Sequence, residues 1–129
     1  MIKQIKLNDK LIAMLVDNRD IEDGTHPVTD PSGSLQMLMM KRKKGHVFLK
    51  HTHKLLERTS NILQEVVVVT EGELIVTVCT RDGVDVGKYS VIRGQCLFLV
   101  DGGYKIEVKE DAAFFEFKNG PHFDDKVLL

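Results

Sequence analysis

The chain has 129 residues and a mass of 14.6 kDa, the size of one ordinary domain and too short for two independent cores. Hydrophobic residues make up 43% of the chain and charged residues 29%, a balance that excludes the disordered and fibrous classes. Eighteen basic and nineteen acidic residues give a net charge of −1, which argues against nucleic-acid binding through bulk positive charge. We therefore expect one soluble domain over residues 1–129.

The cysteines and the apolar runs indicate where such a domain resides. Cys79 and Cys96 form no CxxC pair, so we expect two small buried thiols in a reducing compartment. The longest aliphatic run, the four valines at 66–69, is far below the ~20 apolar residues of a spanning helix. The apolar stretch at 11–16 is too short for a signal-peptide core. The sequence predicts a cytoplasmic protein.

Short β-type runs separated by turn residues follow one another along the chain. In chain order, the expected strands are residues 2–7, 11–16, 35–40, 46–53, 64–70, 73–80, 85–92, 96–100, 104–108 and 113–118. Asp82-Gly83 predicts a tight hairpin, and Ser60-Asn61 favours a loop rather than a helix over residues 54–63. The fold expected is all-β, antiparallel and a single domain.

The valines at 66–69 are apolar on both faces of their expected strand. This pattern is typical of a central strand or of one covered by a partner subunit. Because the interior of one small barrel covers only one face, we expect a homodimer, with strands 2–7 and 11–16 pairing across a twofold axis.

His51 and His53 are the residues most suggestive of chemistry. Two residues apart on a strand, they project to the same face with Cα atoms roughly 6.5–7 Å apart, and two imidazoles so placed can converge on a metal ion. With Glu65 they would form the two-histidine, one-carboxylate triad of non-haem iron, and the same set suits Zn, Ni or Mn. The basic run at 41–44 is either a solvated connection or an anion-attracting rim.

The order of Gly45, His51, His53, Glu65 and Gly72 resembles the first motif of the cupin superfamily, G-x5-H-x-H-x(3–4)-E-x6-G, with a longer spacing before the glutamate. This resemblance covers residues 45–118. It implies a cupin-type antiparallel β-barrel or jelly roll (a double-stranded β-helix), preceded by N-terminal strands within residues 1–40 and followed by a tail at 119–129.

The second cupin motif is matched in part, since Gln95 stands where an aspartate is usual and Tyr104 where a histidine is usual. A narrower similarity is to small bacterial single-domain cupins associated with nucleotide-sugar and surface-polysaccharide biosynthesis. The positions that this similarity or the expected barrel mouth implies for ligand binding are Arg58, Gln64, Glu116, Lys118 and His122. For Glu116 and Lys118, a solvated cross-strand charge pattern remains the alternative.

The resemblance implies a metal-binding protein that acts on a small polar ligand of the sugar or nucleotide-sugar type. His51, His53 and Glu65 would be the metal ligands, and together with Tyr104 the catalytic residues. An isomerase or epimerase would use a histidine or a glutamate for proton transfer. There are two alternatives. One is an iron-dependent oxygenase that uses the same triad. The other is a non-catalytic sugar-binding or regulatory cupin, in which Tyr104 marks a lost metal site. No nucleic-acid or membrane partner is expected.

Overall fold

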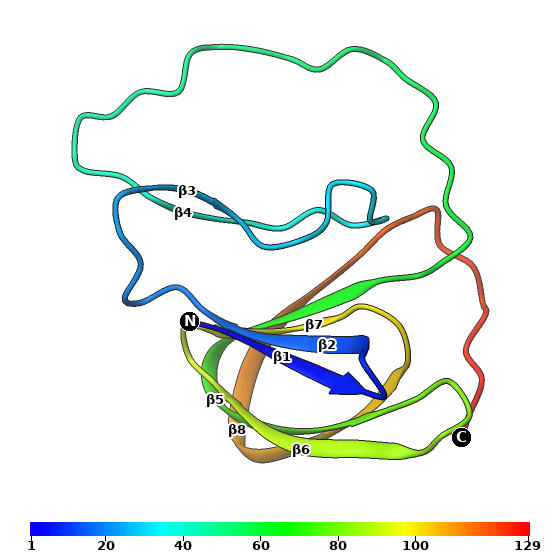
Figure 1. Cartoon of the computed structure of the whole chain (residues 1–129). Coiled ribbons are helices and arrows are strands. Elements are labelled where there is room, and N and C mark those ends of the chain that lie inside the picture. Colours follow the sequence, from blue (N-terminus) through cyan, green and yellow to red (C-terminus); the bar gives the residue numbers. More distant parts are fainter.

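The structure is a computed structural model that describes all 129 residues, and it contains eight strands and no α-helix (Figure 1). The strands are β1 (Ile2–Leu7), β2 (Lys10–Asp17), β3 (Gly24–Pro27), β4 (Leu38–Lys41), β5 (Glu65–Cys79), β6 (Asp85–Ile92), β7 (Gln95–Leu99) and β8 (Gly103–Lys118). Every pairing between them is antiparallel, which confirms the expected all-β antiparallel fold. No helix is present that is long and apolar enough to span a membrane.

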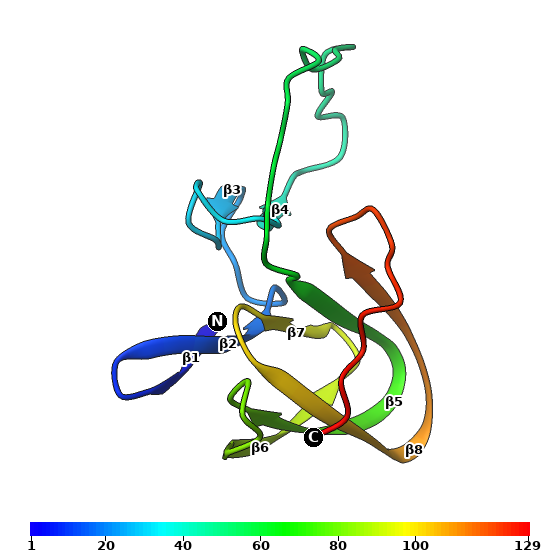
Figure 2. The same ribbon diagram turned by 90° about the vertical axis from the view of Figure 1, so that its right-hand side faces the viewer.

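Six strands form one curled sheet in the order β1-β2-β7-β5-β6, with β8 pairing along β5. The sheet bends round into a half-barrel, and its first strand returns towards β6 (Figures 1 and 2). At this approach the Nζ atom of Lys3 lies 5.2 Å from the centroid of the Tyr89 ring. Because β8 has no strand neighbour other than β5, its outer edge is open.

Two pairs of expected strands are each one long bent strand. Residues 64–70 and 73–80 merge into β5, and residues 104–108 and 113–118 merge into β8, with register shifts between Val69 and Leu74. Gly72 permits this bend, because its φ is +72° and a Cβ there would lie 2.1 Å from the backbone oxygen of Asp111. The breaks expected between these pairs of strands are therefore bends within continuous strands.

The core lies on both faces of the central strands. Inside the half-barrel, Val67 and Val69 of β5 pack in the same cluster as Leu97 of β7. On the opposite face, Val66 packs in a second cluster with Met39 of the β3–β4 hairpin. The hairpin thus covers the outer face, so both faces of the valine run are covered within one chain. This confirms the central-strand alternative, and the valine run no longer supports a dimer.

The cysteines lie in these same strands. Cys79 ends β5 and Cys96 lies in β7, and both are free and buried, as expected. Burial raises the pKa of the Cys96 thiol to about 11, so this side chain remains a protonated thiol at neutral pH. Both cysteines therefore act as small hydrophobic residues of the core.

The strand expected at residues 46–53 is absent from the structure, so that expectation is wrong. Residues 42–64 run away from the sheet between β4 and β5 without regular structure (cyan to green in Figure 2). No neighbouring strand pairs with them, and the side chains of Val47 and Leu49 are 73% and 82% exposed. The expected loop over 54–63 is confirmed. Strand β3 was not predicted, because Gly24 and Pro27 at its ends resemble turn residues.

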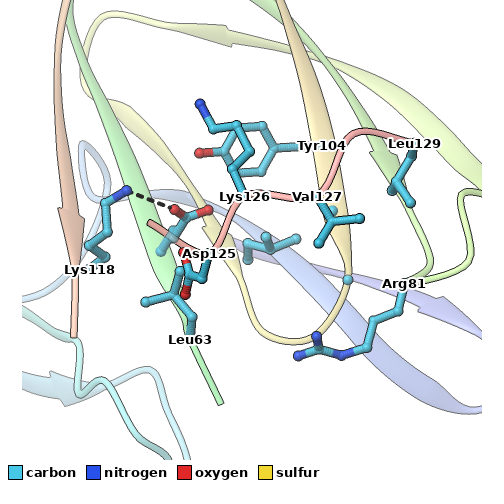
Figure 3. A pocket seen from close by; sticks show the side chains of 12 residues that line it. Leu63, Arg81, Tyr104, Lys118, Asp125, Lys126, Val127 and Leu129 are labelled. Carbon is cyan, nitrogen blue, oxygen red and sulfur yellow. Dashed lines mark ion pairs between the residues drawn. The ribbon is translucent and has the colours of Figure 1, made fainter. Parts of the chain in front are cut away.

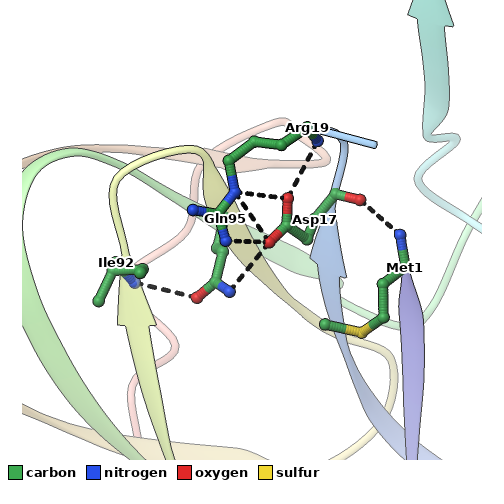
Figure 4. Close-up of polar contacts among 5 residues, drawn as sticks. All are labelled: Met1, Asp17, Arg19, Ile92 and Gln95. Atoms are coloured by element: carbon green, nitrogen blue, oxygen red, sulfur yellow. Dashed lines mark hydrogen bonds and ion pairs between the residues drawn. The ribbon is translucent and has the colours of Figure 1, made fainter. Parts of the chain in front are cut away.

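A hydrogen-bonded cluster at Asp17 joins β1, β2 and β7 (Figure 4). The Asp17 carboxylate accepts hydrogen bonds from the Arg19 Nε atom at 2.9 Å and from Gln95 Nε2 at 3.1 Å, while its backbone oxygen accepts one from the Met1 amino group at 2.7 Å. The Arg19 hydrogen bonds hold the pKa of Asp17 well below its usual range. Gln95 Oε1 also accepts a hydrogen bond from the Ile92 amide at 3.2 Å. Gln95, which stands at the aspartate position of the second cupin motif, therefore stabilises the turn between β6 and β7.

Candidate functional site

A cavity of about 390 Å³ opens at one end of the half-barrel. Its walls come from the start of β5, the turn before β8, the two ends of β8 and the C-terminal tail (Figure 3). The polar side chains in its lining are Glu65, Arg81, Tyr104, Lys118, Asp125 and Lys126. Residues far apart in the sequence therefore meet at this cavity, which is the best candidate for a functional site.

Three polar side chains of the cavity lining, Glu65, Tyr104 and Lys118, form one connected cluster with the neighbouring Glu116. The Lys118 Nζ atom lies 3.2 Å from Glu65 Oε1 and 3.5 Å from Glu116 Oε1. The Tyr104 hydroxyl donates a hydrogen bond to Glu116 Oε1 at 2.9 Å. The Glu65 side chain is 14% exposed, whereas those of Lys118 and Glu116 are 40% and 38% exposed. The cluster is thus anchored in the barrel and open to solvent on one side.

The charges of this cluster fix the protonation of its members. Burial, followed by the nearby Glu65 and Glu116 carboxylates, raises the pKa of Tyr104, so the phenol keeps its proton. Burial acts to raise the pKa of Glu116, but the Tyr104 hydrogen bond and Lys118 outweigh it, and that pKa is lowered. The Glu65 carboxylate raises the pKa of Lys118. At neutral pH the cluster presents the neutral Tyr104 phenol, the Glu116 carboxylate and the Lys118 ammonium group.

Arg81 lies at the rim of the same cavity, on the turn that follows β5. Its guanidinium pairs with the Asp101 carboxylate, which also accepts Lys10 at 2.5 Å. Burial would raise the pKa of Asp101, but these two cations lower it overall. The ion pair orients the guanidinium beside the cavity. Sequence reasoning missed Arg81 because it stands in an ordinary hairpin turn and matches no motif position.

The structure does not bring the histidine pair to this cavity. His51 and His53 are exposed in the 42–64 segment, with ring centroids 5.5 Å apart, and His51 Nδ1 donates to the Leu49 carbonyl at 2.7 Å. Glu65 instead faces Lys118. No group of three or more His, Cys, Asp or Glu side chains lies close enough to hold a metal ion. In this arrangement the three expected ligands do not fit a shared metal site.

The remaining predicted ligand-binding residues divide into two groups. Glu116 and Lys118 belong to the cluster, and His122 lines a smaller cavity of about 190 Å³ that shares Lys118 with the first. Arg58 is exposed in the extended segment, where its Nη1 atom donates to the Leu56 carbonyl at 3.3 Å. It does not reach the cavity in this structure.

Gln64 is buried, and its side chain holds the chain together beside the cavity. The amide oxygen accepts a hydrogen bond from the Leu35 amide at 3.0 Å, and the amide nitrogen donates to the Val100 carbonyl at 3.1 Å. Both polar ends of the side chain are satisfied by backbone groups. Its contacts are therefore structural, and it positions the start of β5 rather than a ligand.

The comparisons with known proteins leave the family open: no family model, no curated protein and no solved structure matches the chain.

Proposed function

We propose that this chain is a cupin-type protein that binds a small polar ligand, of the sugar or nucleotide-sugar type, in the cavity beside Tyr104. The observation that carries the proposal is the mixed lining of donors and acceptors around one aromatic ring. Glu65 can accept hydrogen bonds from sugar hydroxyls, and Lys118 can donate them. The cavity, of about 390 Å³, lies within the range of small-molecule sites.

The reaction that we propose is an isomerisation or epimerisation by proton transfer. A carboxylate of the cluster would remove a proton from a sugar carbon and, as the carboxylic acid so formed, return a proton to the same or a neighbouring carbon. The raised pKa of Tyr104 keeps the phenol protonated at neutral pH, so Tyr104 takes part as a hydrogen-bonding group rather than as an acid.

Binding without catalysis is the second candidate, and one observation favours it. Lys118 lies 3.5 Å from Glu116, and together with the Tyr104 hydrogen bond it lowers the pKa of that carboxyl group, which makes Glu116 a weaker base. The oxygenase alternative gains no support from this arrangement, because His51 and His53 lie outside the cavity.

Within the all-β class, we propose that the half-barrel is part of a cupin jelly roll. The first half of β8 has an open edge, and residues 46–53 have no strand partner. Antiparallel addition of these residues beside Gly103 and Tyr104 would satisfy both edges and carry His51 and His53 towards the cavity. Slow hydrogen exchange at the amides of 47–51, with fast exchange at 55–60, would support this addition. Fast exchange in both stretches would contradict it.

Proton NMR in D₂O tests the function. The protein is incubated with sugars, sugar phosphates and nucleotide sugars, and the exchange of carbon-bound hydrogen for deuterium is followed. Catalysis by proton transfer predicts exchange at one carbon, lost when Glu65 and Glu116 are both changed to Gln and kept in Lys6→Met, an exposed position on β1 that does not line the cavity. Saturable binding with no exchange would favour the non-catalytic candidate. Neither binding nor exchange with any compound would contradict the proposal.

A further inference from the structure

The last part of β8 presents an aromatic surface and an open edge together. Phe114, Phe115 and Phe117 are 40%, 60% and 54% exposed, and the Phe115 and Phe117 rings lie 6.2 Å apart between centroids. Phe115 pairs with Val68 of β5 and Phe117 with Val66, so these two rings continue the face that the β3–β4 hairpin covers elsewhere. An exposed apolar strand edge tends to associate with another strand unless it is protected.

We infer that a second copy of this chain covers this edge, with Glu116, Phe117 and Lys118 at the end of β8 pairing antiparallel with the same residues of the second copy across a twofold axis. The charges in this stretch favour one register. When Phe117 faces Phe117 of the partner subunit, Glu116 faces Lys118 of the partner subunit, and the same pair forms again on the other side of the axis. Opposite charges directly across an antiparallel pair stabilise it.

The neighbouring registers lack this complementarity. With Glu116 on the axis, two carboxylates face each other, which is destabilising. With Phe115 on the axis, Glu116 faces an aromatic ring and Lys118 faces Ala112 of the partner subunit, so no opposite charges meet. Of these three registers, only the one centred on Phe117 sets opposite charges against each other, and a second copy is the occupant that it fits.

The interface also reaches the cavity. Glu116 accepts the Tyr104 hydrogen bond, and in the paired register Lys118 of the partner subunit adds a second cation beside that carboxylate. This consequence rests on the proposed function and favours a ligand that carries negative charge, whereas the interface itself is independent of any ligand.

Sedimentation velocity across the micromolar range tests the interface. We expect a concentration-dependent dimer whose Kd weakens at least ~10-fold in Phe117→Lys, which puts two cations on the axis, and is unchanged in Phe123→Lys on the tail. Lys118→Glu should also weaken the dimer, and the double change Glu116→Lys with Lys118→Glu should restore it. A monomer at every concentration, or a dimer that Phe117→Lys leaves intact, would overturn the inference.

Cross-linking tests the register without relying on a disruptive charge. Phe117→Cys places two thiols on the axis, and the native cysteines are buried. Mild oxidation should give a covalent dimer in Phe117→Cys and little in Phe123→Cys, a control whose side chain is 66% exposed in the parent. Equal cross-linking in both variants would show random collision and overturn the pairing.

Discussion

Tyr104 and Glu116 are twelve residues apart on one strand, yet the Tyr104 hydroxyl donates to Glu116 Oε1 at 2.9 Å. The contact exists because β8 follows the bend of β5 and brings its two ends to the same cavity (Figure 2). Gly72 lies at that bend, where it meets the backbone of Asp111. The geometry of the candidate site therefore depends on one backbone position far from it in the sequence.

Gly72→Ala should destabilise the fold strongly. The new Cβ would lie 2.1 Å from Asp111 O, and the residue would keep a positive φ that alanine disfavours. We expect a loss of more than about 2 kcal/mol in the free energy of unfolding, measured by urea denaturation. Gly83→Ala is the matched control, because φ is +88° there but the nearest atom is 3.5 Å away. Equal losses in the two variants would contradict the role of the close approach.

The β3–β4 hairpin should stabilise the sheet through Met39. This side chain is 8% exposed and packs in the cluster that contains Val66, whereas its neighbour Met40 is 49% exposed. Met39→Ala should cost about 2–3 kcal/mol of unfolding free energy, and Met40→Ala less than about 0.5 kcal/mol. Thermal denaturation of the two variants checks this. A similar cost in both would mean that the hairpin does not cover the valines.

The Asp17 cluster makes stability depend on pH. Because the folded pKa of Asp17 is lowered from 3.8, its contribution is present above the unfolded pKa and is lost as the pH falls through the folded one. Asp17→Asn should therefore be about 1–2 kcal/mol less stable than the parent at pH 7. The difference should shrink below pH ~4. A difference that is constant with pH in urea titrations would contradict this.

Carboxyl ¹³C NMR titration tests the electrostatics of the cavity. Tyr104→Phe removes the hydrogen bond that lowers the pKa of Glu116, and Lys118→Met removes a cation that lowers it as well, so each change should raise that pKa. Lys126→Met should leave it unchanged. A Glu116 pKa that does not move in Tyr104→Phe would show that the hydrogen bond is absent in solution.

Alternation and turn residues predicted the fold class and most strands, because local patterns determine them. They did not predict that β5 and β8 run through the turns at Gly72 and Asp111, because that continuity depends on pairing between distant residues. For the valine run they left a central strand and a partner subunit as alternatives, and they did not identify the cover of its second face, which is a hairpin with one buried residue, Met39.

The candidate site was predicted only in part, because its geometry also depends on pairing between residues distant in the sequence. Tyr104, Glu65, Glu116 and Lys118 come together as expected of one site, although the resemblance to cupins and not their spacing suggested them. Spacing placed the histidine pair on a strand, but a strand also needs a partner edge, and the structure leaves residues 46–53 unpaired. The cavity residues of the tail carry no signal in the sequence.

The central claim is that the cavity beside Tyr104 binds a small polar ligand, and a ¹⁵N–¹H NMR titration tests it most directly. The ligands are the sugars, sugar phosphates and nucleotide sugars used for deuterium exchange. The account predicts saturable shifts at the amides of Gly103, Tyr104 and Lys118 with at least one compound, and affinity about tenfold weaker in Tyr104→Phe. Shifts confined to other parts of the chain, or binding that Tyr104→Phe leaves unchanged, would contradict it.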